Sequence, residues 1–232
     1  MARLARLAVG GRLHLIVLHA HGKQSVFRDA DDRQVWLDWM SDYAKTERIA
    51  VHAYALLDAW VGLLATPAEA QGVSRWMQAI GRRYGRYFND RHHRRGTLWD
   101  GRYRCTVVDA DHYALSAMVY LDLASVRAGL ATGADQYPWS SHLHYLGLRQ
   151  DRFLTPLASY WSLGNTPFAR EAAYAELVRA GLSSTQASRI EDAVDKAWVL
   201  GDAPFVEELQ PQVPRRVTKG HPGRPRKQSR TE

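Results

Sequence analysis

The order of two hydrophobic periodicities is the feature of this 232-residue sequence that most restricts its fold. Alternating or continuous apolar runs predict strands, and spacing of three to four residues predicts helices. The predicted elements are strands at 13–19, 49–57, 60–65 and 103–108, and helices at 29–47, 72–89 and 111–128. The resulting β-α-β-β-α-β order, followed by a helix, predicts an α+β fold of the ferredoxin-like split βαβ type. It has an antiparallel sheet with helices on one face.

Three segments with different composition follow from this pattern. Residues 1–135 contain the predicted ferredoxin-like domain, which we expect to bind DNA. Residues 136–205 have helical spacing, at 168–180 and 184–200, and predict a helical C-terminal extension. Residues 206–232 are rich in Pro, Gly and Arg, which predicts a disordered basic tail.

The positive charge is concentrated in two places. The tail from 211 to 232 has seven Lys/Arg and one acid, a net +6 of the chain's +7. The segment from Arg75 to Arg104 has nine arginines against two acids, interleaved with aromatic residues. Guanidinium groups neutralise phosphates and aromatic rings stack on unpaired bases, so this segment predicts single-stranded or hairpin DNA as partner. The predicted DNA contacts are Arg75, Arg82, Arg83, Arg86, Arg102 and Arg104.

Each of these patterns has an alternative interpretation. The arginine–aromatic segment is also compatible with a solvated basic helix whose aromatic residues Trp76, Tyr84, Tyr87, Phe88, Trp99 and Tyr103 face the core. In the tail, residues 222–227 resemble an AT-hook core, with Arg224, Arg226 and Lys227 as candidate minor-groove contacts. A generic basic tail is the alternative there, and either would raise nonspecific affinity for DNA.

The cysteine content and the apolar runs indicate a compartment. Cys105 is the single cysteine, so no intrachain disulfide and no cysteine-based metal cluster can form within one chain. The apolar run at 13–18 contains His14 and predicts a strand, with a secretory signal as the alternative. No stretch approaches the ~20 apolar residues of a membrane-spanning helix. We therefore expect a cytoplasmic protein without a membrane partner.

Several longer motifs resemble a known family. They are VSRWMQAIGRRYGRYFN (73–89), GTLWDGRYR (96–104), VVDADHY (107–113), VRAGL (126–130), YPWSS (137–141) and KAWVLGD (196–202). In order and spacing they closely resemble the REP-associated tyrosine transposases, which are single-tyrosine HUH transposases of bacterial mobile elements. The resemblance covers about residues 1–205. It implies a ferredoxin-like core that binds single-stranded DNA beside a short hairpin.

The resemblance also implies metal-dependent chemistry. In the family a tyrosine attacks a phosphodiester and forms a 5′-phosphotyrosine link, assisted by Mg²⁺ or Mn²⁺. The metal ligands are a His–hydrophobe–His triplet on a central strand and an Asn one helical turn after the tyrosine. The tyrosine matches Tyr120, the histidines match Trp60 and Gly62, and the Asn matches Ala124. Because none of these three replacements can coordinate an ion, the resemblance predicts neither a metal cofactor nor strand cleavage. Tyr120 is then a vestigial nucleophile position, or simply a packed aromatic.

A relocated metal site is the alternative, and few residues could build it. His19 and His21 would point to one side of a strand that continued to position 21. Asp58 and Asp122 are the nearest carboxylates in sequence to the replaced positions, and His92-His93 is expected in an exposed loop.

Three functions remain open from the sequence. The preferred one is a transposase-like DNA-binding protein that recognises single-stranded or hairpin (palindromic repeat) DNA without cleaving it. The alternatives are an active metal-dependent tyrosine transposase acting through Tyr120, and a folded relic without a specific ligand. Both a monomer and a dimer are compatible with the sequence.

Overall fold

A computed structural model describes residues 6–219 of the chain, and its centre is a four-stranded antiparallel sheet. The strands are β1 (Leu13–His19), β2 (Ile49–Leu57), β3 (Trp60–Pro67) and β4 (Arg104–Val108), in the order β2-β3-β1-β4. β1 pairs with both β3 and β4, so it is central, whereas β4 lies at one edge. This order is that of the predicted ferredoxin-like split βαβ unit, and the α+β fold class is confirmed.

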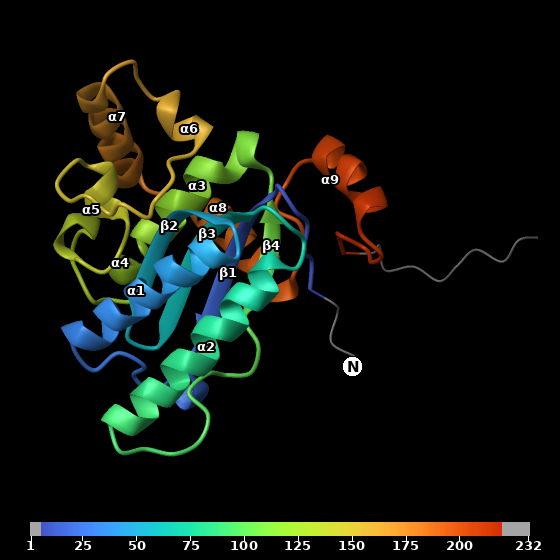
Figure 1. Ribbon diagram of the computed structural model, residues 1–232. Coiled ribbons are helices and arrows are strands. Elements are labelled where there is room, and N and C mark those ends of the chain that lie inside the picture. The colour runs from blue at the N-terminus through green and yellow to red at the C-terminus, as the bar shows by residue number, and fades with distance from the viewer. Residues whose placement is uncertain (1–5, 220–232) are drawn as a thin grey trace, which may run out of the picture.

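The two helices of the split βαβ unit lie side by side in front of the sheet (Figure 1). They are α1 (Ala30–Thr46) and α2 (Gly72–Arg91). Asp29 starts α1 by accepting a hydrogen bond from the Asp32 amide, which satisfies one of the free donors of the first turn. The helices meet through buried aromatic residues, because the Trp36 ring lies 5.1 Å from the Tyr84 ring and at nearly a right angle to it.

The opposite face of the sheet is also covered. Residues 13–18 of β1 are all buried, which requires packing on both faces. Two helices contact each other and the sheet here, α3 (Ala110–Asp122) and α8 (Ser184–Lys196), and Figure 1 shows α8 behind the strands. The predicted single helix at 111–128 is broken at Leu123, after which α4 (Ala124–Arg127) follows. The sequence pattern did not separate these two helices because both are apolar on their inner sides.

The residues that follow α4 form three short helical segments and one helix of 14 residues, which pack on the same core. They are η2 (Ala134–Gln136), α5 (His142–Tyr145), α6 (Ala158–Trp161) and α7 (Pro167–Ala180). A buried carboxylate joins this extension to α3. Asp122 accepts hydrogen bonds from the Tyr174 hydroxyl at 2.7 Å and from Ser141 Oγ at 3.2 Å, and lies 3.1 Å from His142 Nδ1. Such a carboxylate is stable in a low-dielectric interior only with this set of partners.

The C-terminal part departs from the sequence predictions in two places. The helix expected to run to residue 200 ends at Lys196, because Ala197 is left-handed (φ 53°), and the next residues extend along β4. Leu200 exchanges backbone hydrogen bonds with the strand, donating to Val107 and accepting from Asp109, at 2.9 and 2.8 Å.

The predicted disordered tail from 206 is also wrong up to residue 219. The helix α9 (Ala203–Leu209) crosses the expected boundary, η3 (Gln210–Gln212) follows, and Leu209 and Val217 are fully buried beside Leu7 and Val199. Apolar residues among the Pro and Arg of this segment complete a small second core. Arg224, Arg226 and Lys227, with the AT-hook-like motif, lie outside the described residues.

Within the described residues, no helix is both long and apolar enough to cross a membrane.

Candidate nucleic-acid interface

An open groove of about 540 Å³ lies between α2 and the segment that leads into β4. Three of the predicted DNA contacts line it: Arg75, Arg82 and Arg102. Arg6, Trp99 and Tyr103 also line it. The fold therefore brings together arginines that are 27 positions apart in the sequence, because β4 returns beside the start of α2.

Helical spacing explains how α2 forms one wall of the groove. Ser74, Gln78 and Arg82 are four residues apart, and Gly81 lies three residues after Gln78, so these residues share one side of the helix. Gly81 has no side chain, and a Cβ placed there would lie 3.9 Å from the Trp99 indole nitrogen. The groove therefore reaches down to the edge of the Trp99 ring.

The groove arginines differ in how strongly they are neutralised. Arg75 is bonded to Glu47 at 2.5 Å and to Glu69 at 2.9 Å, so its charge is compensated. Arg82 and Arg102 are exposed, and neither has a carboxylate partner among residues 6–219. Exposed, unpaired guanidinium groups are the ones that gain most from a phosphate.

Two of the predicted DNA contacts point elsewhere. The Arg83 guanidinium lies 4.5 Å from the centre of the Trp39 ring and donates a hydrogen bond to the Tyr43 hydroxyl at 3.2 Å, both on α1. Arg86 is exposed but does not line the groove. The i, i+1 neighbours Arg82 and Arg83 thus lie on different sides of α2.

Most of the interleaved aromatic residues belong to the core. Trp76, Tyr84 and Phe88 are buried to 1 % exposure or less, so they cannot stack on bases, and the alternative reading of this segment is right for them. Tyr87 packs edge-on against Trp39. The remaining two, Trp99 and Tyr103, line the groove while also packing against the core.

Arg6 is a groove residue that the sequence analysis did not identify. It reaches across from the N-terminal segment and places its guanidinium 3.9 Å from the centre of the Tyr103 ring. The Tyr103 hydroxyl is held by Ser74 Oγ at 2.8 Å. Only the tertiary fold brings these three residues together, and no local pattern around Arg6 predicts it.

Tyr120 occupies the position that matches the family's nucleophile, and its side chain is packed against its neighbours rather than exposed to a substrate. Its side chain is 9 % exposed, and the Arg127 guanidinium lies 4.0 Å from the ring centre. Burial, opposed in part by Arg127, raises the pKa of the Tyr120 phenol. A raised pKa makes the nucleophilic phenolate rarer at neutral pH, which is the reverse of what a nucleophile needs.

The positions that match the family's metal ligands do not fit a metal ion. Trp60 lies on β3 two residues before Gly62, and its indole covers the position that a side chain at 62 would occupy. Ala124 is buried at the start of α4. In the part of the chain that the structure describes, no group of three His, Cys, Asp or Glu side chains could hold a metal ion.

The residues considered for a relocated site are held apart by other contacts. β1 ends at His19, and His21 begins the 3-10 turn η1 (His21–Lys23), so the two imidazoles are not on one strand as expected. Asp58 is paired with Arg33, and Asp122 belongs to the buried network described above.

The expectation of an exposed loop is wrong for His92. Its Nε2 lies 2.8 Å from the fully buried carboxylate of Asp32, which also pairs with Arg91. The imidazole therefore belongs to a packed network between α1 and the end of α2, whereas His93 is exposed.

Comparison with known structures agrees with this fold. A REP-associated tyrosine transposase bound to a REP hairpin superposes with a TM-score of 0.53 and 12% identity, over 68% of this chain and 99% of that chain. This chain has the fold of that transposase. At 12% identity the similarity shows the fold alone, and this fold is the one that the family resemblance implies.

A second solved structure is less similar. A proposed transposase from Deinococcus radiodurans matches at a TM-score of 0.37 and 15% identity, over 56% of this chain and 98% of that chain, and this score is too low to establish a common fold. No protein-family model and no curated protein matches the sequence.

Proposed function

We propose that this chain is a transposase-like protein that binds hairpin or single-stranded DNA through the groove between α2 and β4, without cleaving it. The observation that carries the proposal is the set of exposed arginines, Arg82 and Arg102, in a groove that also contains Arg6. The shared fold with a transposase bound to a REP hairpin supports DNA as the ligand. Such a protein would act in the cytoplasm as a monomer or a dimer.

The absence of cleavage rests on the residues at the family's reaction positions. Trp60, Gly62 and Ala124 offer no ligand for an ion that would polarise the phosphate. Tyr120 is buried against Arg127, and its raised pKa disfavours the phenolate. A nucleophile without a base, an ion or exposure does not attack a phosphodiester at a useful rate.

Fluorescence anisotropy with the full chain tests the binding. The probes are a labelled hairpin from a bacterial palindromic repeat and a scrambled strand of the same length. We expect a preference of at least about tenfold for the hairpin, which is about 1.4 kcal/mol. Replacing Arg224, Arg226 and Lys227 by Gln should lower both affinities while keeping the preference. Equal, weak binding of both probes would favour the folded relic.

A pair of neighbouring variants tests the groove. Arg82→Gln removes a groove cation, and we expect it to weaken hairpin binding about tenfold. Arg83→Gln changes the net charge equally, but Arg83 lies against Trp39 and outside the groove. We expect this variant to weaken binding by less than about twofold. If the two variants weaken hairpin binding equally, the groove is not the DNA-binding site.

A denaturing gel tests the alternative of an active transposase. The full chain is incubated with the labelled hairpin and Mg²⁺ or Mn²⁺, beside Tyr120→Phe. We expect no covalent protein–DNA band in either lane. A band that requires Tyr120 and the ion would overturn the proposal that cleavage is lost.

A further inference from the structure

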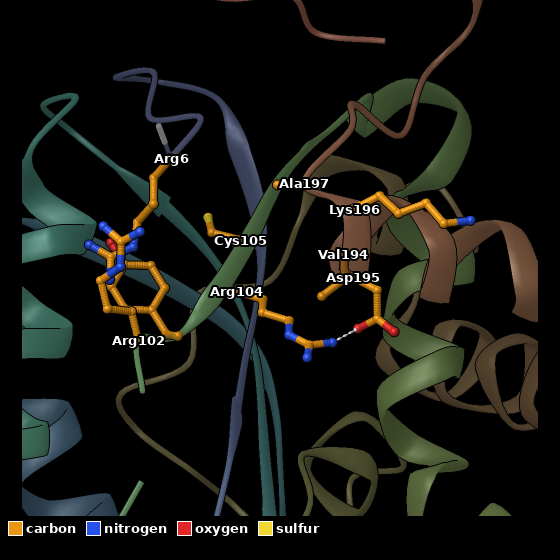
Figure 2. A pocket seen from close by; sticks show the side chains of 9 residues that line it. Arg6, Arg102, Arg104, Cys105, Val194, Asp195, Lys196 and Ala197 are labelled. Atoms are coloured by element: carbon orange, nitrogen blue, oxygen red, sulfur yellow. Dashed lines mark hydrogen bonds and ion pairs between the residues drawn. The ribbon is translucent and has the colours of Figure 1, made fainter. Parts of the chain in front are cut away.

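A second and smaller pocket, of about 210 Å³, straddles the edge of β4 beside the groove (Figure 2). Arg6, Arg102 and Tyr103 line both hollows, so the two lie next to each other. Figure 2 shows Arg6 and Arg102 on one side of β4, and Arg104 reaching from the other side of the strand to Asp195 of α8. A chain lying in the groove can therefore pass over the edge of the sheet toward α8.

The pocket lies beside the part of the β4 edge that residues 198–200 do not cover. Leu200 pairs with Val107 and Asp109, and the Thr106 hydroxyl donates to the Trp198 carbonyl. Among the described residues, these contacts cover β4 from position 106 onward. Residues 102–105 line the pocket instead, where Arg104 is partly exposed and Cys105 is buried.

The charge of the pocket favours an anion. It is lined by three guanidinium groups, of Arg6, Arg102 and Arg104, and by one carboxylate, that of Asp195. Asp195 is exposed and pairs only with Arg104 among the described residues. The Nε atom of Arg6 is buried and has no hydrogen-bond partner in the described part of the chain.

The other polar groups do not oppose an anion. Burial raises the pKa of the Cys105 thiol to about 12, so it stays uncharged at neutral pH. The Lys196 ammonium is bonded to Asp192 at 2.6 Å, so this pair adds little net charge. The phosphates of a nucleic-acid backbone are anions whose oxygens match the hydrogen-bond donors of guanidinium groups.

The aromatic ring in the pocket cannot read bases. Arg6 covers the Tyr103 ring at 3.9 Å, and Ser74 holds its hydroxyl. The pocket therefore offers charge without a free stacking surface. Contacts of this kind position a nucleic acid without selecting its sequence. With a volume of about 210 Å³, the pocket is also too small to enclose a DNA duplex.

We propose that this pocket binds internal phosphodiesters of an unpaired DNA strand that continues from the groove over the edge of β4. Arg6 and Arg102 contact the strand from one side of β4, and Arg104, released from Asp195, contacts it from the other side. The proposal rests on the proposed DNA binding, and adds to it a strand path and a sequence-independent contact.

The test compares a blunt hairpin with the same hairpin carrying a six-nucleotide thymidine extension, using the full chain. Thymidines are suitable because the pocket is indifferent to the base. We expect the extension to tighten binding about tenfold. Arg104→Gln should abolish this gain while keeping the affinity for the blunt hairpin, and the exposed Arg102→Gln should reduce the gain too. Arg86→Gln, which lines neither hollow, should leave the gain unchanged.

Neutral phosphate analogues make the test specific for a phosphate. One methylphosphonate is moved along the extension, and one or two positions should lower the affinity of the wild-type chain by about the full gain. The same positions should have no effect in Arg104→Gln. An extension ending in a phosphate should bind no more tightly than one ending in a hydroxyl. Tightening only by the terminal phosphate would assign the pocket to a phosphate monoester and overturn the strand path.

The outcomes separate the two proposals. If the blunt hairpin binds in preference to a scrambled strand but the extension adds nothing, the pocket proposal is wrong and DNA binding in the groove stands. If neither hairpin binds in preference to the scrambled strand, both proposals are wrong. If the gain survives in Arg104→Gln and in Arg102→Gln, the extension binds elsewhere and the pocket proposal is wrong.

Discussion

The indole of Trp60 covers Gly62 on the same face of β3. A Cβ placed at position 62 would lie 2.7 Å from Trp60 Cζ3 and 2.6 Å from Leu121 Cδ2, closer than such atoms approach in folded proteins. A side chain at position 62 therefore requires the Trp60 or Leu121 side chain to move. The two residues at the positions that we match to the family's histidines are thus mutually dependent, and the contact with Leu121 of α3 adds to the restriction.

Gly62→Ala should destabilise the protein by about 1–3 kcal/mol, because the added methyl overpacks a closed contact. In a Trp60→Ala background the same change should cost at least about 1 kcal/mol less, which is the coupling expected of touching residues. Urea unfolding of the four proteins measures this cycle. Gly85→Ala is the control, since a Cβ there meets nothing within 4 Å on a helix, and it should stabilise by about 0.5–1 kcal/mol. If the effects of the substitutions at 60 and 62 on the free energy of unfolding are additive, the Trp60 indole does not pack over position 62.

Replacing Trp60 by His, Gly62 by His and Ala124 by Asn together should create a Mn²⁺ site. The first substitution removes the indole that fills the space, and the three supply nitrogen and oxygen ligands. Electron paramagnetic resonance should detect protein-bound Mn²⁺ in the triple variant and none in the wild type. The double variant without Ala124→Asn should bind more weakly. A folded triple variant without bound Mn²⁺ would show that the family's positions are matched wrongly here.

Asp195→Asn should increase the affinity for single-stranded DNA up to about fivefold. The exposed ion pair with Arg104 is worth at most about 1 kcal/mol, and its loss frees a cation for phosphate. Anisotropy with an extended hairpin measures the change. Asp192→Asn removes the same charge one turn earlier, but from a pair with Lys196, and should have a smaller effect. A decrease in affinity for Asp195→Asn would show that the carboxylate helps binding.

Tyr174→Phe should destabilise the protein by about 1–3 kcal/mol, because it leaves the fully buried Asp122 without its shortest hydrogen bond. Thermal and urea unfolding measure the effect. Tyr113→Phe removes a hydroxyl that donates to the exposed Asp202 and should change the stability by less than about 0.5 kcal/mol. If both variants are equally stable, the Asp122 network does not hold the extension to α3.

Acid should destabilise the fold through His14. This residue is fully buried, and its Nε2 accepts a hydrogen bond from the Val9 amide. Burial lowers the pKa of His14 to about 4 from an ordinary value of 6.5. The unfolded chain therefore binds a proton first as the pH falls. The free energy of unfolding is not affected by His14 above about pH 6.5. It falls as the pH is lowered toward 4, by about 3 kcal/mol in total.

Urea unfolding at several pH values between 7.5 and 4 measures this dependence. His14→Gln should make the loss of stability with falling pH shallower, although it lowers the stability at pH 7.5 because the amide replaces a fully buried ring. Exposed His93→Gln is the control and should keep the wild-type slope. An unchanged slope in His14→Gln would assign the acid sensitivity to other groups, such as His52, whose pKa burial also lowers.

The sheet could be predicted from the sequence because its periodicities are local. Each strand is a short apolar run, and the tight turn at Asp58-Ala59 fixes the pairing of β2 with β3. The break at Leu123 and the left-handed Ala197 were missed, because neither glycine nor proline marks them. Tertiary contacts decide both: the pairing of Leu200 with β4 requires the helix to end early.

The candidate site was predicted only in part, for a related reason. The helical position of Arg82 and the closeness of Arg102 to β4 follow from local spacing. The orientation of Arg83 toward Trp39 depends on where α1 packs, and the contribution of Arg6 depends on a segment about a hundred residues away in sequence from Tyr103. Aromatic residues in a basic segment were ambiguous because burial, which decides their role, is a property of the whole fold.

The docking of Val217 beside Val199 has a consequence for the cationic residues that follow. The Val199 amide donates to the Val217 carbonyl at 2.9 Å, and Arg215 bonds to the Ala197 carbonyl, next to the pocket on β4. The chain therefore leaves the described structure from an anchored point close to the arginines. Cations attached by a short tether act at millimolar effective concentration on a ligand bound nearby. Residues 220–232 would thus slow the escape of a bound polyanion and favour its recapture.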